Sequence, residues 1–453
     1  MTTPRKVFFA LALLDAASVF VVFNVVSFAR GLSAGPLTYS ALIVPYLILT
    51  FAIYLIDGYR SRTDMLSLDY TSEHVIALLS ALLTTLLLTF VLLPSGYELQ
   101  SSRIVIALSY VVLIPLTLSY RRILCQRMEA ARVSRSIVFI GDEASYQAFR
   151  DECERLQMVQ PLIYANAEPT SEQRAGAPAR SFGEIIDGAL AGKISVEAIV
   201  LRESARELQP EVSRKLVELY FSGLPTYTLE LFHQVYWRKI PLYRLNQTWL
   251  FQEGFPIARE PVFERLKRAT DIVLASIGIA LAAPVVFLGA LAVWLESGRP
   301  IFFKQKRIGR NQVPFVVRKL RSMRVGSDKG DLYTRPDDQR VTRVGRFLRA
   351  TRIDEFPQLW NVLRGDMSLI GPRAEWDRLV ENYQCEIPCY HFRHLVKPGI
   401  TGWAQINYPY GASLEDTLRK LEYDLYYIRH FSFRLDAAII LKTVHVILFG
   451  KGQ

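Results

Sequence analysis

The sequence is poor in cysteine, with 4 in 453 residues. So few thiols at irregular spacing exclude the disulfide framework of a small secreted domain, and they favour a reducing compartment for the soluble parts. Cys385 and Cys389 are followed by His391 and His394, but this spacing matches no standard zinc knuckle. We interpret both cysteines as core or interfacial residues, with a zinc site as the alternative.

Outside one stretch the chain also lacks any excess of charge. The net charge is +11, yet residues 299–352 hold 16 Lys and Arg against 4 Asp, which leaves 38 basic and 39 acidic residues elsewhere. A basic stretch of this kind binds nucleic acid, anionic lipid or a phosphate-rich small molecule. It contains no helix-turn-helix or RNA-module signature, so we expect no nucleic-acid partner.

Apolar residues are abundant, at 51% of the chain against 21% charged. Four long apolar runs precede residue 121, at Val7–Phe28, Leu37–Ile56, Val75–Leu93 and Ile104–Leu118. A membrane-spanning helix needs about 20 apolar residues, with a lower limit of about 17. A cleaved signal peptide would not be followed by three further runs. We therefore predict four transmembrane helices within residues 1–125.

Basic residues gather on one side of these predicted spans. They lie before the first run, after the second and after the fourth, whereas the two opposite loops carry one arginine each, Arg30 and Arg103. Cytoplasmic loops are enriched in Lys and Arg. Both the N-terminus and everything after residue 121 are therefore predicted to face the cytoplasm.

A fifth apolar run, Ala269–Leu295, has basic residues at both ends and Pro284 in its middle. Proline removes a backbone donor and breaks or kinks a helix. Because a spanning helix should be basic on one side only, we predict a re-entrant membrane helix over about residues 269–296, broken at Pro284. The alternative is a kinked spanning helix, which would export the C-terminal third of the chain.

Residues 134–258 alternate short apolar strands with helical stretches, which is typical of a small parallel α/β sheet. Dinucleotide-binding domains carry Gly-x-Gly-x-x-Gly after the first strand. Here only Gly141 is present, and Asp142 and Glu143 occupy the place of the phosphate. We predict a degenerate Rossmann-like domain with a structural or assembly role.

The basic stretch ends on two adjacent carboxylates. Arginines recur at every third position over Arg343–Arg352, and Asp354 and Glu355 follow directly. A purely structural explanation of this pair is that the two residues lie at a helix N-terminus, where their negative charge complements the helix dipole. Arginines concentrated in this way favour an anionic ligand, beside which one carboxylate could act as an ionised nucleophile and the other bind Mg²⁺.

Two segments carry several motifs in order: Thr342–Arg373 reads TRVGRFLRATRIDEFPQLWNVLRGDMSLIGPR, and Lys397–Asn407 reads KPGITGWAQIN. Both segments resemble the bacterial sugar transferase family, the monotopic phosphoglycosyl transferases. The resemblance covers residues 262–453, and the preceding membrane helices and degenerate domain resemble the large form of the family. Ala374 and Lys397 depart from the Pro and Arg that are frequent in the family, which bears on the subfamily and the sugar.

The resemblance implies a catalytic domain over residues 262–453 that transfers a hexose 1-phosphate from a UDP-sugar to undecaprenyl phosphate and releases UMP. Asp354 would attack the sugar-linked phosphate to form a covalent phosphosugar intermediate, and Glu355 would bind Mg²⁺. Pro284 matches the break of the family's re-entrant helix. The cations expected around the phosphates are Lys319, Arg321, Arg349, Arg352 and Arg373.

The same resemblance implies a bacterial inner-membrane protein that initiates exopolysaccharide, capsule or O-antigen assembly. Its expected partners are the UDP-sugar donor, the undecaprenyl phosphate acceptor and membrane lipid, with a homodimer left open. A non-catalytic membrane scaffold and a membrane-tethered nucleic-acid binder are the alternatives. The scaffold does not require the Asp354–Glu355 pair, so the presence of this pair favours the enzyme.

Overall fold

A computed structural model describes residues 4–31, 37, 39–60, 63–93, 96, 98–133, 135–166, 185, 188, 194–202, 210–221, 223–242, 261–326, 338–408, 411 and 413–449. The chain forms two compact units. The first unit comprises residues 1–46, 58–71 and 88–238, and the second comprises residues 47–57, 72–87 and 239–453.

All four N-terminal apolar runs form helices, as predicted. They are α1 (Pro4–Ala29), α2 (Tyr39–Leu55), α3 (Leu68–Leu87, extended by a π-helical turn) and α4 (Arg103–Val133). In the part of the chain that the structure describes, α1, α3 with its extension, α4 and a later helix, α10, are long and apolar enough to cross a membrane. Helix α2 has 17 residues, about the lower limit for a span.

A buried ion pair joins α1 to α4 and explains the carboxylate inside the first apolar run. Arg121 Nη2 lies 2.6 Å from Asp15 Oδ2, and both side chains are fully buried. Tyr59 Oη donates to the same oxygen at 2.5 Å, and Tyr120 donates to Oδ1. Ionised groups among membrane helices pair with one another in this way because an isolated charge is costly there.

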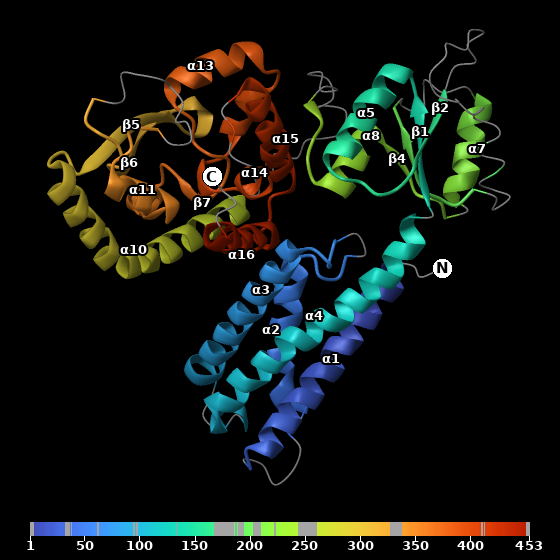
Figure 1. Ribbon diagram of the computed structural model, residues 1–453, viewed down its shortest axis with the longest axis horizontal. Helices are drawn as coiled ribbons and strands as arrows, with labels where there is room; N and C mark the ends of the chain where they lie inside the picture. The colour runs from blue at the N-terminus through green and yellow to red at the C-terminus, as the bar shows by residue number, and fades with distance from the viewer. Residues whose placement is uncertain are drawn as a thin grey trace. The chain divides into compact units, whose positions relative to one another are not determined.

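The predicted parallel sheet is present in the first unit. Its strand order is β2-β1-β3-β4, and every pair is parallel. The strands are β1 (Ser136–Gly141), β2 (Leu162–Asn166), β3 (Val196–Leu201) and β4 (Thr226–Thr228). Helix α7 (Pro210–Phe221) packs on one face, and α5 (Glu143–Arg155) and α8 (Leu229–Phe232) pack on the other (Figure 1).

The turn after β1 is filled by the protein's own charged side chains. Asp142 Oδ1 accepts a hydrogen bond from the Ser145 backbone N–H at 3.0 Å and so caps α5. Arg202 forms an ion pair with Asp142, and a Cβ added at Gly141 would lie 2.6 Å from the Cβ of Arg202. This arrangement agrees with the carboxylates that the sequence places in this turn.

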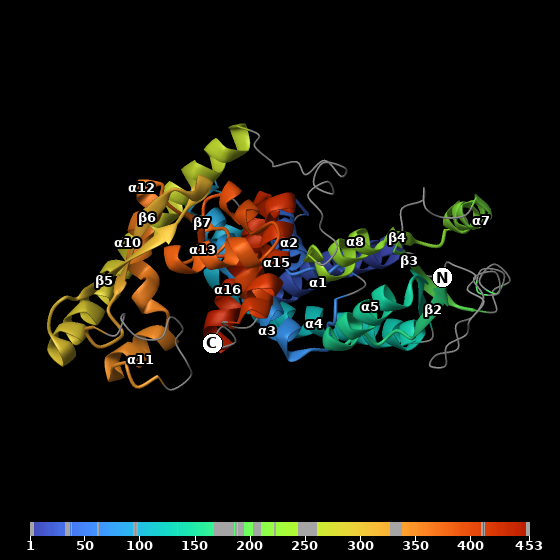
Figure 2. The same ribbon diagram turned by 90° about the horizontal axis from the view of Figure 1, so that it is seen from above.

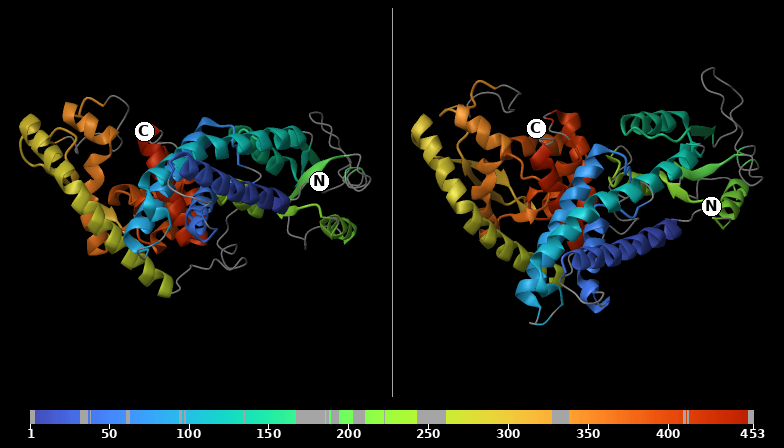
Figure 3. Two further views of the ribbon diagram at one scale, coloured as in Figure 1. Left: turned by 90° about the horizontal axis from the view of Figure 1, so that it is seen from below. Right: turned by 60° about the horizontal axis from the view of Figure 1, so that its bottom comes forward.

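The fifth apolar run forms α10 (Pro261–Ser297), a helix of 37 residues that contains Pro284. The helix is continuous through the proline, as the views in Figures 2 and 3 show, and it is bent along its length in Figure 1 (yellow). The predicted break is therefore a bend within one helix, because a proline costs one backbone hydrogen bond without ending the helix. The re-entrant placement stays a prediction.

The second unit continues from α10 into a hairpin, two short strands and six helices among its described residues. The hairpin pairs β5 (Phe302–Ile308) with β6 (Pro314–Leu320), and β7 (Ser368–Ile370) lies parallel to β8 (Gly399–Thr401). The helices are α11 (Arg343–Ala350), α12 (Leu359–Arg364), α13 (Asp377–Glu386), α14 (Trp403–Asn407), α15 (Leu414–His430) and α16 (Phe433–Phe449).

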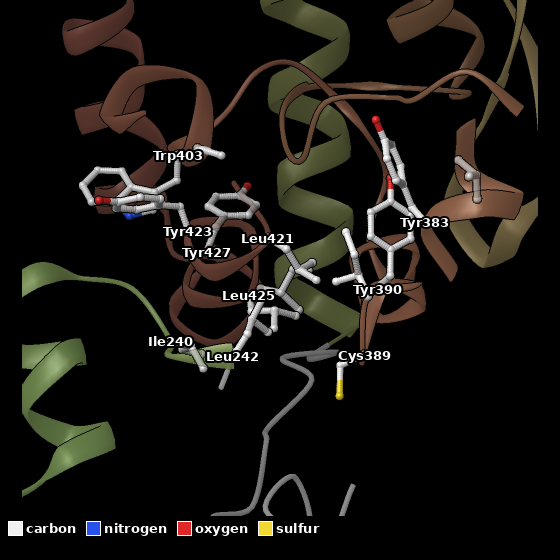
Figure 4. Packing of buried hydrophobic residues seen from close by; sticks show 14 of the residues in the cluster. Ile240, Leu242, Tyr383, Cys389, Tyr390, Trp403, Leu421, Tyr423, Leu425 and Tyr427 are labelled. Atoms are coloured by element: carbon white, nitrogen blue, oxygen red, sulfur yellow. The ribbon is translucent and has the colours of Figure 1, made fainter. Parts of the chain in front are cut away.

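The main core of this unit packs aromatic and aliphatic residues of α13, α14 and α15 together (Figure 4). Ile240 and Leu242, which precede the predicted boundary at residue 262, are buried in the same core. Lys239 Nζ also lies 2.9 Å from Glu422 Oε2 of α15, with both side chains almost fully buried. The segment Lys239–Leu242 is therefore an integral part of the second unit.

Candidate active site

The adjacent carboxylates lie on a single turn between two helices. Helix α11 is followed by Arg352, whose backbone is left-handed at φ 56° and ψ 17°. A non-glycine residue in this conformation costs about 1 kcal/mol or more and is found preferentially at functional sites. The turn starts a short 3₁₀ helix, Ile353–Gln358, that carries Asp354 and Glu355. The pair is thus presented by a tight turn before α12.

Asp354 is the more buried member of the pair, with 6% of its surface exposed. Burial and the negative charge of Glu355 raise its pKa to about 6, although Lys319 and Arg349 favour the ionised form. Among the described residues, none donates a hydrogen bond to this carboxylate. At neutral pH Asp354 is mostly ionised and its oxygens are free of protein donors, which suits a nucleophile.

Glu355 has a different environment. Its Oε1 accepts a hydrogen bond from Arg373 Nη2 at 3.1 Å. Burial opposes its ionisation, but the positive charges of Arg373 and Lys319 outweigh burial and lower the pKa of Glu355 to about 2. The two carboxylates therefore differ in pKa and are suited to different roles.

Lys319 approaches the carboxylates from β6. Burial and the nearby charge of Arg307 lower its pKa to about 8, whereas Glu355 and Asp354 favour its charged form. Its strand partner is Phe303 of β5. The hairpin thus supplies one ammonium group to the site, and that group remains mostly charged at neutral pH.

The backbone around Arg373 is fixed by two arginines that the sequence reasoning did not single out. Arg393 Nη2 donates to the carbonyl of Arg373 at 3.0 Å, and Arg307 Nη1 donates to the carbonyl of Ala374 at 2.5 Å. Arg393 also binds Asp424 Oδ2 at 2.9 Å. Arg307 lies in the basic stretch, which was a usable signal, but no motif marked Arg393.

The two recognised sequence segments meet backbone to backbone through glycines. A Cβ added at Gly399 would lie 2.1 Å from the N of Gly371, and one at Gly402 would lie 2.2 Å from the O of Gly371. No side chain fits at either distance. These contacts hold Gly371 and the following Arg373 in place beside β8.

The structure gathers most of the predicted phosphate-site cations but directs one elsewhere. Lys319, Arg349 and Arg373 act on the pKa of Asp354, and Arg352 acts on the pKa of Glu355. Arg321 Nη2 instead donates to the carbonyls of Ser297 and Gly298, at 2.7 and 2.9 Å, and so caps the C-terminal end of α10.

The residues of this site lie within a part of the chain that matches a known family. The model of the family described as bacterial sugar transferase matches residues 262–450. A UDP-glucose:undecaprenyl-phosphate glucose-1-phosphate transferase of Caulobacter vibrioides is 42% identical over 206 residues, which are 45% of this chain and 77% of the relative. The chain belongs to the bacterial sugar transferase family.

Two further relatives align over smaller shares of their length. One is a UDP-N-acetylgalactosamine-undecaprenyl-phosphate N-acetylgalactosaminephosphotransferase of Aeromonas hydrophila, 38% identical over 262 residues, or 58% of this chain and 61% of the relative. The other is a UDP-glucose:undecaprenyl-phosphate glucose-1-phosphate transferase of Escherichia coli, 48% identical over 182 residues, or 40% of this chain and 39% of the relative. The chain thus spans less than two thirds of both relatives.

Proposed function

We propose that this bacterial sugar transferase moves a hexose 1-phosphate from a UDP-sugar to undecaprenyl phosphate at the cytoplasmic face of the membrane, and so starts the assembly of a membrane-linked glycan. The observation that carries the proposal is Asp354, a buried and mostly ionised carboxylate surrounded by cations. The names of the relatives support the choice of donor and acceptor classes.

In the first step, a carboxylate oxygen of Asp354 attacks the phosphorus bonded to the sugar. The bond from this phosphorus to the oxygen bridging the two phosphates breaks, and UMP leaves with that oxygen. The result is an aspartyl phosphosugar. Lys319, Arg349 and Arg373 lie where they favour negative charge, so they are suited to hold the donor phosphates.

In the second step, a phosphate oxygen of undecaprenyl phosphate attacks the same phosphorus. The bond to Asp354 breaks, the carboxylate is regenerated, and the lipid leaves as its diphosphate-linked sugar. The acceptor's tail remains in lipid, so the proposed re-entrant placement of α10 would hold the site at the membrane surface. This step needs no external oxidant or reductant.

We propose Mg²⁺ as the cofactor of this site. Magnesium in phosphoryl-transfer sites is usually held by one or two carboxylates together with substrate phosphates and water. No group of three or more His, Cys, Asp and Glu able to hold a metal occurs among the described residues, so the protein alone offers few ligands. Glu355, with its pKa of about 2, is the carboxylate we assign to the ion, which would neutralise charge on the donor phosphates.

The test uses the full chain in nanodiscs with Mg²⁺ and a panel of UDP-sugars, with and without undecaprenyl phosphate. Without acceptor, we expect a stoichiometric burst of UMP and a phosphosugar adduct on Asp354; with acceptor, we expect turnover. Asp354→Asn should abolish both, whereas Glu381→Gln, an exposed carboxylate change on α13, should retain them. Turnover by Asp354→Asn would contradict the covalent step, and failure with every sugar would favour the scaffold.

A further inference from the structure

The β5–β6 hairpin has two chemically different faces. Lys319 belongs to the face turned toward the carboxylates. Side chains alternate along a strand, and the opposite face is exposed at successive alternate positions of both strands. The exposed residues of this second face are Phe302, Lys304, Lys306, Pro314, Val316 and Arg318. We refer to these six residues as the outer hairpin face.

Like charges stand directly opposite each other on the outer hairpin face. Lys304 pairs in register with Arg318, and Lys306 pairs with Val316. Like charges at opposed positions destabilise a strand pair. Within the described part of the chain, the one carboxylate recorded beside these three cations is Asp377, whose Oδ2 lies 4.0 Å from Lys306 Nζ. Among the described residues this repulsion is therefore left mostly uncompensated, which favours an anionic partner.

Apolar side chains are mixed with these cations. Val316 is 47% exposed and Phe302 is 43% exposed, and Val313 in the turn between the strands is 61% exposed. A highly charged surface that also exposes apolar side chains suits the boundary between lipid headgroups and acyl chains. A purely aqueous polyanion would not require the apolar residues.

The outer hairpin face also lies close in the chain to the membrane helix. Helix α10 ends at Ser297 and β5 begins at Phe302. The last turns of α10 still expose Trp294 and Leu295, at 48% and 72%. If α10 lies in the membrane, the hairpin therefore begins near the membrane surface.

We propose that the outer hairpin face binds the phosphate headgroups of anionic phospholipids in the membrane that holds α10. Lys304, Lys306 and Arg318 contact the headgroups, and Phe302 and Val316 lie against the upper acyl region. This binding surface is separate from the Asp354 site, since it occupies the other side of the hairpin. The proposal rests on the membrane placement of α10 and does not depend on the identity of the sugar.

The experiment places a reporter on this face. Val316→Cys is introduced with Cys385→Ser, which removes the exposed native thiol, and is labelled with an environment-sensitive fluorophore. Full-length protein is reconstituted in nanodiscs of phosphatidylethanolamine with increasing phosphatidylglycerol. We expect a blue shift and protection from iodide quenching that grow with the phosphatidylglycerol fraction, and both should weaken at high salt.

A charge variant and a matched control complete the test. Lys304→Gln, Lys306→Gln and Arg318→Gln together should raise the phosphatidylglycerol fraction needed for half of the shift by at least about fivefold. Arg150→Gln, Arg214→Gln and Arg378→Gln remove the same charge from exposed positions on other helices and should leave the titration unchanged. Circular dichroism and size exclusion report whether each variant is folded.

Several outcomes would overturn the proposal. One is a fluorophore that stays accessible to iodide at every lipid composition in folded protein. Another is a spectral shift caused by inorganic phosphate or by an oligonucleotide in neutral nanodiscs, without any response to phosphatidylglycerol. UMP release is measured separately in the same samples, so a failure of the lipid proposal is distinguishable from a failure of the transferase proposal.

Discussion

Replacing Lys319 with methionine should move the pH dependence of the reaction in a defined direction. Asp354 must be ionised to attack, so kcat/KM should rise with pH through its pKa of about 6. Lys319 lies among the charges that lower this pKa, and removing one nearby opposite charge raises a carboxyl pKa by about one unit or more. The acid limb of Lys319→Met should therefore move to about pH 7 or above.

The size of the effect follows from the fraction of Asp354 that is ionised. A rise of about one unit corresponds to about 1.4 kcal/mol, and near pH 6 it lowers the ionised fraction from about one half to about one tenth. The variant should thus lose about tenfold more activity near pH 6 than near pH 8, beyond any uniform loss from weaker phosphate binding. About fivefold comes from Asp354, and about twofold comes from Lys319, which is already half neutral near pH 8 in the unmodified protein. The basic limb of the unmodified protein, near the Lys319 pKa of about 8, should disappear.

The assay measures initial rates of UMP release at donor concentrations far below KM, where kcat/KM reports the ionisations of the free enzyme. Arg378→Gln, an exposed cation on α13, serves as the control and should keep both limbs. Parallel pH profiles for Lys319→Met and the unmodified protein, differing only by a constant factor, would refute the electrostatic link between Lys319 and Asp354.

Three further changes test other parts of the structure. Arg373→Gln removes the partner of Glu355, so the pKa of Glu355 should rise and the Mg²⁺ dependence of UMP release should change with pH; an unaltered magnesium titration across pH would contradict this. Asp15→Ala leaves Arg121 buried and unpaired and should cost about 3–5 kcal/mol in an unfolding measurement, whereas Asp15→Leu with Arg121→Leu should recover most of the loss. Gly399→Ala places a Cβ 2.1 Å from the N of Gly371 and should cost about 3 kcal/mol of folding stability. Gly278→Ala is the control, because its Cβ would meet only the Leu359 side chain, at 3.3 Å. Equal melting temperatures for the two variants would argue against tight packing of Gly371 against Gly399.

The four N-terminal helices and the parallel sheet follow from local sequence patterns. Apolar runs of about 20 residues can form few other structures, and α1 to α4 are present where the runs lie. Asp15 interrupts such a run, and its explanation required a partner 106 positions away. No periodicity within the first helix indicates Arg121, because the pairing depends on how α1 and α4 pack.

In the candidate site, too, some features were predictable from the sequence and others depended on tertiary contacts. The adjacent carboxylates and the arginines before them were visible as a pattern, and two of these arginines, Arg349 and Arg352, act on the pKa values of the two carboxylates. Arg321 and Lys319 are both cations of the same basic stretch, two positions apart, and the sequence does not distinguish them. Lys319 lies near the carboxylates, whereas Arg321 binds the end of α10. Arg393 was missed because its role depends on a carbonyl 20 positions away. Composition identifies candidate charges, whereas tertiary packing assigns each one to its partner.

Contacts at both ends of α10 favour the re-entrant placement over a spanning one. Near its start, Arg268 donates to the carbonyls of Val362 and Leu363 on α12, at 2.5 and 2.6 Å. At its end, Ser297 accepts from Arg321, and both sets of contacts are made with the same compact unit. A straight span would separate the two ends by about 30 Å of hydrocarbon and leave one end without these partners. We therefore expect that cysteines substituted for Arg265 and Arg299, in a cysteine-free background, react with a membrane-impermeant maleimide from the cytoplasmic side alone. Labelling of the two positions from opposite sides would mean that α10 spans the membrane, and the contacts at one of its ends would then have to be broken.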